Sequence, residues 1–418
     1  MNKFYNLKYT LFEILGQFYI SPYNFLKKLL IFCKEKEKYK TYSSKLKKNI
    51  TNSSKKTIIV IDNSVPEYDL HAGARTIFDY LQLFKDIGFD VKFIPDDFIK
   101  REPYASELEN SGIEVLHGKW CKKNYQKWII RNANQITFVM LNRPRSIKYL
   151  NFFKQYTKAK IIYYGMDMYF VRELNKYSLE KSKASLRASK YYKFIELFMY
   201  NNSDIILTVS NKEKNDIKTL IKKDKVYTFP CFFYRNFRNE EYVFEKRKNL
   251  IFVGGQKHPP NEDAVIWFST QIMPKIAAKY PDLKICIIGK YSKNFTDNYS
   301  SQNIEFKGNI SDDELKKLYI SSRMAVIPLR YGAGVKGKTI EAFYNGIPIV
   351  TTDYGIEGLY DTNDFTLLAN NAQKFSELII NFYNDKDMLI NIHSKSLKYI
   401  QDHFSYEHAL NTMLKILN

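Results

Sequence analysis

From residue 57 onward, short apolar runs alternate along the chain with segments of helical period. The first run, at residues 57–61, is continuous and rich in β-branched side chains, and a helical pattern follows at 76–87. Further apolar runs in this half lie at residues 91–94, 113–116, 135–140, 160–164 and 204–209. Because buried parallel strands are continuously apolar, the alternation predicts a doubly wound parallel sheet.

The alternation begins again after residue 248. Its apolar runs lie at residues 249–255, 283–289, 304–308, 324–329 and 347–351. We therefore predict an α/β fold of two Rossmann-like domains, at residues 57–233 and 249–400, joined by a charged linker at 234–248. Ligands bind at the carboxyl ends of the strands in such sheets, so two such edges are expected to face each other across a cleft. Residues 401–418 are expected to form a C-terminal helix that packs back on the first domain.

Residues 1–56 form a separate segment. Ser21 and Pro22 are a favourable helix start, and the apolar residues that follow are interleaved with lysines. This pattern predicts a basic amphipathic helix followed by a polar linker, without the small-residue cleavage site of a signal peptide. Two interpretations stay open: a helix packed on its own domain, and a helix that lies on a membrane surface.

Composition narrows the class of protein. The chain has 418 residues, of which 45% are hydrophobic, so a disordered or collagen-like protein is excluded. A mean hydropathy of −0.40 and the lack of a long apolar run argue against a transmembrane helix. The four cysteines, at positions 33, 121, 231 and 286, are far apart, which fits a reducing cytosol better than a disulfide framework or a zinc site.

The net charge of +21 is confined to the first half of the chain. Residues 250–418 contain 18 basic and 18 acidic residues and are neutral. Residues 1–56 carry 13 Lys and 3 Glu, and residues 143–200 carry 13 basic and 4 acidic residues. The usual partners of such a basic half are nucleic acid, an anionic membrane surface or a phosphate-bearing substrate.

The most informative stretch is a glycine-rich loop at residues 328–338, between a predicted strand and a predicted helix. Gly332, Gly334 and Gly337 allow close approach of the backbone to a ligand, and the helix that begins near Lys336 offers free N–H donors. Lys336 and Lys338 flank that helix end, which suits a diphosphate.

Glu341 lies one turn further along the same helix, where its carboxylate can accept hydrogen bonds from ribose hydroxyls. Together with the loop it indicates a nucleoside diphosphate. The alternative is an ordinary turn with solvated lysines and a surface Glu. The P-loop pattern GxxxxGK[ST] is missing, so a P-loop NTPase is not supported.

These residues resemble a known family. The stretch 332–350 resembles the donor-binding segment of the family 4 retaining glycosyltransferases, which have the GT-B fold. The likeness extends to other stretches in both halves, at residues 65–75, 204–210, 252–264, 303–308 and 352–359. It covers about residues 57–418. It implies transfer of a sugar from a nucleotide-diphosphate sugar with retention, without a metal and without a further cofactor.

The resemblance assigns roles by position. Glu341 matches the second Glu of the family's Glu-x7-Glu signature, which contacts the ribose, whereas Ala333 stands where the first Glu contacts the donor sugar. Main-chain groups of Gly332 to Gly334 are available as substitutes. Lys336 and Lys338 match a basic pair of one subgroup and are expected to act in catalysis by stabilising the departing diphosphate.

The family's Arg and Lys after the first strand of the second domain are missing. Gly255 and Asn261 stand at those positions, with Lys257 nearby. We therefore include Gly255 and Lys257 among the expected donor-binding residues, together with Gly332, Gly334, Lys336, Lys338 and Glu341.

Candidate acceptor-side residues lie at strand ends of the first domain. Asp167 and Arg172 follow one strand, and Gly73 and Arg75 lie in a loop after another. The alternative for the first pair is a helix N-cap Asp with a surface Arg, and Arg75 has the alternative of pairing with a neighbouring acid.

The acidic groups Asp96-Asp97 and Asp312-Asp313-Glu314 resemble metal ligands, but we interpret both as helix caps or first-turn acids and expect no metal site.

The sequence thus predicts a glycosyltransferase that acts on a glycan or a lipid-diphosphate-linked acceptor in bacterial surface polysaccharide synthesis. The basic first half is interpreted as a contact with an anionic membrane surface, which places the protein in the cytoplasm, on the inner face of the membrane, with no nucleic-acid partner. Two alternatives stay open: a nucleotide-sugar epimerase of the same architecture, and a non-catalytic basic binding or scaffold protein.

Overall fold

A computed structural model describes residues 56–70, 72–237, 241–332 and 334–418. The predicted amphipathic helix at residues 1–56 therefore lies outside the described residues, apart from Lys56. The described chain divides into two compact units. The first unit contains the residues up to Phe232 together with Leu410–Asn418, and the second unit contains Phe233–Ala409.

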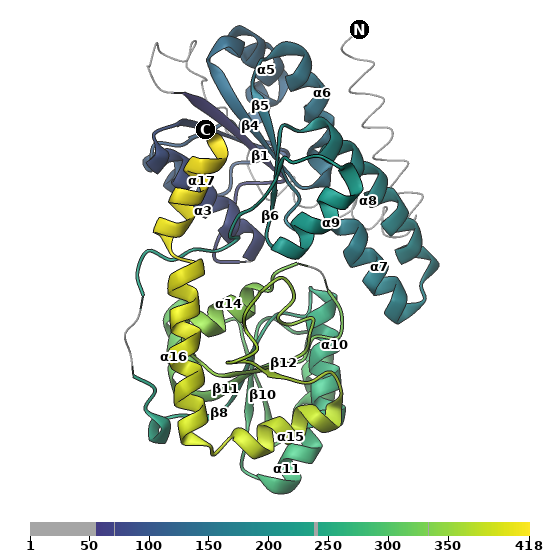
Figure 1. Ribbon diagram of the computed structural model, residues 1–418, viewed down its shortest axis with the longest axis vertical. Coiled ribbons are helices and arrows are strands. Elements are labelled where there is room, and N and C mark those ends of the chain that lie inside the picture. Colours follow the sequence, from purple (N-terminus) through teal and green to yellow (C-terminus); the bar gives the residue numbers. More distant parts are fainter. Residues whose placement is uncertain (1–55, 71, 238–240, 333) are drawn as a thin grey trace. The chain divides into compact units, whose positions relative to one another are not determined.

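The first unit is built on a parallel sheet of seven strands in the order β3-β2-β1-β4-β5-β6-β7 (Figure 1). The strands are β1 (Thr57–Asp62), β2 (Asp90–Pro95), β3 (Glu114–Val115), β4 (Ile136–Asn142), β5 (Lys160–Tyr164), β6 (Ile205–Thr208) and β7 (Val226–Thr228). All residues of β1 are buried, as the continuous apolar run predicts for a central strand.

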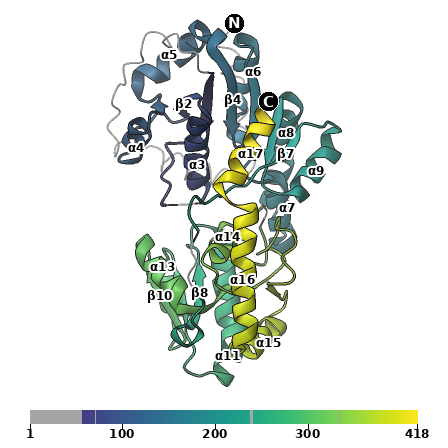
Figure 2. The same ribbon diagram turned by 60° about the vertical axis from the view of Figure 1, so that its left-hand side comes forward.

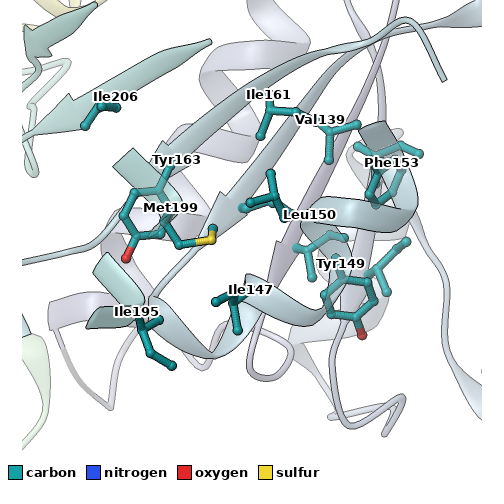
Figure 3. Close-up of a cluster of buried hydrophobic side chains, with 14 of the residues drawn as sticks. Val139, Ile147, Tyr149, Leu150, Phe153, Ile161, Tyr163, Ile195, Met199 and Ile206 are labelled. Carbon is teal, nitrogen blue, oxygen red and sulfur yellow. The ribbon is translucent and has the colours of Figure 1, made fainter. Parts of the chain in front are cut away.

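Helices connect the strands of the first unit. They are α3 (Ala72–Ile87), α4 (Tyr104–Asn110), α5 (Gly118–Arg131), α6 (Ile147–Tyr156), α7 (Tyr169–Glu180), α8 (Lys183–Asn202) and α9 (Asn211–Ile221), with 3-10 turns at Ala133–Gln135 and Pro144–Ser146. Buried side chains of α6 and α8 pack on those of the central strands, where Leu150 and Met199 lie among Val139, Ile161 and Tyr163 (Figure 3). This packing fixes the strand ends that carry the polar residues described below.

The second unit repeats the architecture with six parallel strands in the order β10-β9-β8-β11-β12-β13. The strands are β8 (Lys248–Val253), β9 (Ile285–Ile288), β10 (Ile304–Gly308), β11 (Ser322–Ile327), β12 (Ile349–Thr351) and β13 (Leu367–Leu368). The helices are α10 (Pro259–Trp267), α11 (Met273–Lys279), α12 (Lys293–Tyr299), α13 (Asp312–Ser321), α14 (Gly337–Tyr344), α15 (Ala372–Phe382) and α16 (Lys386–His403), with a 3-10 turn at Phe244–Lys246 and a π-helical turn at Phe268–Ile272. The last helix, α17 (Tyr406–Leu417), begins in the second unit, and its residues from Leu410 onward belong to the first. The predicted fold class, two Rossmann-like parallel-sheet domains, is confirmed.

Each sheet contains one point where the order of strands reverses. In the first unit it lies between β1 and β4, and in the second unit between β8 and β11. The connections after the two strands on either side of this point lead in opposite directions along the sheet. This leaves room for a ligand at the carboxyl ends of these two strands. These two points are called the first and second switch points below. Each unit is expected to bind its ligand at its own switch point.

The unit boundaries differ from the predicted ones. Tyr242 and Arg247, inside the expected linker, are buried in the second unit: the Tyr242 hydroxyl donates to the Arg323 carbonyl at 2.7 Å, and Arg247 Nη1 donates to the Tyr319 carbonyl at 2.9 Å. The described residues of the expected linker therefore belong to the second unit, which begins at Phe233. The predicted boundary at residue 400 falls inside α16, and the second unit continues to Ala409.

Helix α14 is held at its C-terminal end by α16, which lies beside it (Figures 1 and 2). Gly346 follows the helix with a φ of +59°, a conformation that glycine adopts without strain. A Cβ atom there would lie 2.3 Å from Nδ1 of the buried His393 on α16, which itself lies 2.6 Å from the Gly346 carbonyl oxygen. Both the turn and the helix contact therefore require glycine at this position.

Candidate functional site

The glycine-rich loop lies at the second switch point. It leaves β11 and leads into α14, and the turn Gly254-Gly255 leaves the neighbouring strand β8. Lys338 connects the two: its amine donates to the Asn261 side-chain oxygen at 2.6 Å and lies 4.3 Å from the centre of the Phe252 ring. Asn261 in turn donates to the Gly255 carbonyl oxygen at 3.0 Å. The lysine is thus held by a neutral amide and an aromatic face.

Gly254 makes room for this arrangement. A Cβ atom on Gly254 would lie 2.6 Å from the Lys338 amine and 2.7 Å from Cγ of Asn261, closer than any real contact. A Cβ atom on Gly255 would meet only ordinary contacts, the nearest at 3.5 Å. The Tyr291 hydroxyl also donates to the Gly254 carbonyl oxygen at 2.6 Å. The turn after β8 is therefore fixed in place by its neighbours on both sides.

Lys336 stands at the N-cap position of α14, where its amine donates to the Gly334 carbonyl oxygen. The same amine lies 3.3 Å from a carboxylate oxygen of Glu357 in the loop after β12. Gly332 lies against this side chain, because a Cβ atom there would be 3.1 Å from Cε of Lys336. The loop thus folds back so that both lysines lie at the N-terminal end of α14, where free backbone N–H groups favour an anion.

Two groups of this site have strongly shifted pKa values. Desolvation, together with the positive charge of Lys336, lowers the pKa of the Lys338 amine to about 7. Burial raises the pKa of the Glu341 carboxyl to about 7, against the hydrogen bond that Glu341 accepts from the Tyr319 hydroxyl at 3.2 Å. Near neutral pH both groups are partly protonated. Such shifts are common at binding and catalytic sites.

The structure thus brings together Gly255, Gly332, Gly334, Lys336 and Lys338 at the second switch point, with Glu341 one turn along α14. Lys257 is exposed in the turn before α10 and is not part of the lysine contacts just described.

The first switch point carries a different group. Arg143, just after β4, pairs with Asp62 at the end of β1, with 2.7 Å between Nε and the carboxylate oxygen. Asp62 is 5% exposed. A Cβ atom on Gly73 would lie 3.0 Å from Nη2 of Arg143, so Gly73 lies against this ion pair.

Gly73 and Arg75 lie in the first turn of α3, and not in a loop as predicted, because the helix begins at Ala72. Arg75 pairs with Asp79 on the same helix at 3.1 Å and is exposed, which is the alternative foreseen for it.

Asp167 and Arg172 pair with each other at 2.9 Å, and the Arg172 guanidinium lies 4.1 Å from the centre of the Tyr169 ring. The alternative of a helix N-cap Asp is wrong, because Met168 occupies that position of α7. The N–H groups of Tyr169 and Phe170 instead donate to the two carboxylate oxygens of Glu196, both at 2.9 Å. Glu196 is fully buried on α8, and burial raises the pKa of its carboxyl to about 8.

The two acidic groups differ in role. Ser311 and Glu314 form a capping box at the start of α13, and Asp312 and Asp313 lie in its first turn, as predicted. The same interpretation is wrong for the group after β2. Its two carboxylates pair with basic side chains, Asp96 with Arg145 and Asp97 with Arg101. No cluster of three or more His, Cys, Asp or Glu side chains is placed to hold a metal ion in the part of the chain that the structure describes. Nor does any helix there combine the length and apolar composition needed to span a bilayer.

Comparison with known proteins supports a glycosyltransferase. Residues 247–385, which contain the second switch point, match the family of glycosyl transferases group 1. An uncharacterized 44.6 kDa protein in the cps region of Klebsiella pneumoniae is 25% identical over 406 residues, spanning 86% of this chain and 99% of its own.

Solved structures share the fold. Sucrose-phosphate synthase from Thermosynechococcus elongatus has a TM-score of 0.64 at 15% identity, over 87% of this chain and 98% of its own. Anabaena HepE in complex with UDP and glucose has a TM-score of 0.63 at 12% identity, over 87% of this chain and 99% of its own. Together with the family match, these likenesses support a glycosyltransferase of the GT-B fold.

Several residues of the two switch points were missed by sequence reasoning. Asp62 and Arg143 lie 81 positions apart, and Lys338 and Asn261 lie 77 apart, so no local motif joins them. Asn261 had been noted only as a departure from the family's Lys, and Glu357 only as part of a matching stretch. The signal that would have joined them is topological: each lies at or after the carboxyl end of a strand, and these strands are neighbours in the sheet.

Proposed function

We propose that this protein is a retaining glycosyltransferase that uses a nucleotide-diphosphate sugar as donor. The observation that carries the proposal is the convergence of Lys336, Lys338 and the N-terminal end of α14 at the second switch point. Lys336, at the N-cap of α14, has its amine 3.3 Å from a Glu357 carboxylate oxygen, and Lys338 is held by the neutral Asn261. Two amines and the N-terminal end of a helix lie together here, an arrangement that suits a polyanion such as a diphosphate.

In the proposed reaction the bond between the anomeric carbon and the β-phosphate oxygen breaks. A bond forms from an acceptor hydroxyl oxygen to the same carbon and on the same face, and the hydroxyl proton ends on the released diphosphate or in water. Lys336, Lys338 and the backbone N–H groups stabilise the negative charge that develops on the leaving group. No metal or further cofactor is required by this proposal.

Glu341 is proposed to accept hydrogen bonds from the ribose hydroxyls. Its carboxylate already accepts one hydrogen bond, from Tyr319 at 3.2 Å, and has acceptor capacity left for others. UDP is the first nucleotide to test, because the HepE structure holds UDP and glucose.

Transfer to an acceptor separates this function from an epimerase of the same architecture. We expect the wild-type protein to release free nucleoside diphosphate from UDP-glucose, UDP-GlcNAc or UDP-galactose only when a glycan acceptor is added. The double variant Lys336→Ala/Lys338→Ala is expected to lose this release while its acceptor affinity stays within about twofold, since a lost charged hydrogen bond weakens only the diphosphate contact. Interconversion of the sugars without an acceptor would contradict the proposal, as would normal turnover of the double variant.

The first unit is proposed to bind the acceptor, through Gly73, Arg75, Asp167 and Arg172. A glycan or a lipid-diphosphate-linked acceptor suits a guanidinium, because Arg172 can pair with hydroxyl or phosphate oxygens. The relative from the cps region of Klebsiella pneumoniae supports a place in surface polysaccharide synthesis.

Peripheral binding to the inner face of the membrane is proposed to use α8. Lys183, Lys190 and Lys193 are exposed on this helix, and Phe194, directly after Lys193, is 58% exposed. Anionic lipids attract each such cation by about 1 kcal/mol, and an exposed aromatic ring partitions into the interface.

This surface can be tested by co-sedimentation with phosphatidylglycerol vesicles. The variant Lys183→Glu/Lys190→Glu/Lys193→Glu is expected to abolish binding. Its matched control, Lys275→Glu/Lys279→Glu/Lys316→Glu, changes the charge equally on exposed positions of the second unit and is expected to keep it. Equal loss in both variants would contradict a specific surface on α8.

A further inference from the structure

The loop after β12 carries a carboxylate with no role so far. Glu357 lies in this loop, and its side chain is 15% exposed. Its oxygen Oε2 lies 3.3 Å from the amine of Lys336, whose side chain is 10% exposed. An ion pair this sheltered is screened little by solvent and salt. The Glu357 carboxylate therefore attracts the amine of Lys336, the lysine proposed to contact the diphosphate.

The backbone around Glu357 is fixed to the glycine-rich loop and to α14. The Thr339 hydroxyl on α14 donates to the Gly355 carbonyl oxygen at 2.6 Å, and the Thr352 hydroxyl donates to the Leu329 carbonyl oxygen. The N–H group of Gly355 donates back to the Thr352 carbonyl oxygen at 2.9 Å. The loop after β12 is thereby tied to the same two segments that carry Lys336.

Lys336, in contrast, reaches its position through a flexible four-carbon stem. A lysine on such a stem loses much rotamer freedom when it is fixed on a phosphate. The Gly334 carbonyl oxygen and the Glu357 carboxylate both accept from the Lys336 amine, so two acceptors from two loops define where the amine stands. That position is at the N-cap of α14.

We infer that Glu357 is a positioning residue of the donor site, which holds the Lys336 amine in place for the diphosphate. The inference rests on the proposed function and adds to it a residue from a third strand end, beyond those of β8 and β11. It predicts that Glu357 acts only through Lys336. A carboxylate that contacted the donor sugar directly, or that served only the folding of its loop, would act even where Lys336 is absent.

A double-mutant cycle separates these cases. UDP, GDP and ADP are first compared by calorimetry, and the tightest-binding nucleotide is used with wild type, Glu357→Ala, Lys336→Met and the double variant. We expect Glu357→Ala to weaken diphosphate binding about tenfold and to lower kcat by a similar factor, the scale of one misplaced charged contact. The double variant is expected to behave as Lys336→Met alone, because the two changes remove the same contact. Glu357→Gln, which keeps the volume and an acceptor oxygen, is expected to lie between Glu357→Ala and wild type.

Three results would overturn the inference. One is a double variant in which the two losses multiply, since Glu357 would then act independently of Lys336. Another is a Glu357→Ala variant that binds the nucleotide as tightly as wild type or more tightly, since the carboxylate would then merely oppose the phosphates. A third is an equal loss of affinity for the nucleoside without phosphates, which would indicate a general structural defect. Failure of the wild-type protein to bind any of the three nucleotides would instead refute the proposed function, and the inference would fall with it.

Discussion

The two switch points have the same topology and opposite chemistry. At the first, Asp62 and Arg143 face each other at 2.7 Å with side chains 6% and 18% exposed, so one charge neutralises the other. At the second, Gly254 stands at the strand end, and Lys338 is held by a neutral amide and a ring while Lys336 shares one carboxylate. The first switch point holds one buried ion pair, whereas the second holds two amines beside the N-terminal end of a helix. The topology therefore indicates where a ligand can bind, and the charged groups at each point indicate which of the two binds an anion.

The largest expected effect is on the stability of the first unit. Arg143→Met leaves the buried Asp62 carboxylate unpaired and should lower the free energy of unfolding by about 3–5 kcal/mol, the usual result of removing one partner of a buried pair. The first transition in a urea titration measures it. Arg75→Met is the control, because the exposed Arg75–Asp79 pair contributes about 0–1 kcal/mol. Equal destabilisation by the two changes would remove the basis of the comparison.

The matching change at the second switch point should affect binding and not stability. Lys338→Met keeps the stem over the Phe252 ring and removes the amine. Nucleoside diphosphate affinity should fall by about 1.5–3 kcal/mol, the contribution of a charged hydrogen bond, while the unfolding free energy is unchanged or increases because a desolvated amine is removed. Calorimetric titration and urea unfolding report the two effects. A variant that is strongly destabilised would show that Lys338 is structural.

A pair of neighbouring glycines tests whether the close approach at the second switch point matters. Gly254→Ala would place Cβ 2.6 Å from the Lys338 amine and should weaken nucleotide binding by about 1–3 kcal/mol through overpacking. Gly255→Ala, whose nearest contact would be 3.5 Å, should bind nearly as wild type. Thermal shift with added nucleotide ranks the two variants. Similar losses in both would mean that the turn is sensitive for another reason.

The smallest expected effect is a pH dependence of binding. The pKa of the Lys338 amine is about 7, so in the unliganded site its protonated fraction falls from about one half at pH 7 to about one tenth at pH 8. A diphosphate favours the protonated amine, so affinity should fall about fivefold over this interval as binding comes to require proton uptake. Calorimetry in buffers of different ionisation enthalpy measures the uptake. In Lys338→Met the part of the fall that belongs to this amine should disappear, leaving only what comes from the Glu341 carboxyl, whose pKa is also about 7. A fall of unchanged size would contradict the assignment to Lys338.

Sequence patterns predicted the two sheets well because their central strands are continuous apolar runs. The structure confirms β1, β4, β8 and β11 within one or two residues, whereas the short edge strands β7 and β13 were missed. β7 and β13 are only three and two residues long and have no periodicity to detect, whereas the equally short edge strand β3 was found because it lies within the apolar run at 113–116. Within the site, local spacing was sufficient to find Lys336 and Lys338. The partners Asn261 and Glu357 depend on which strands are neighbours, which local spacing does not contain.

The contact between Gly346 and His393 limits which segments of the chain can be exchanged between related proteins without disturbing the site. The glycine-rich loop is short, but α14 behind it is positioned by a glycine that only fits against α16, nearly fifty residues later in the chain. If only the loop and α14 were transferred to another protein, the surface of α16 that orients the helix would be missing. Because Lys338 is also held by Phe252 and Asn261, the smallest segment that can be exchanged by recombination while keeping the lysines in place extends from β8 through α16. Variation in this region is expected to be inherited as one block.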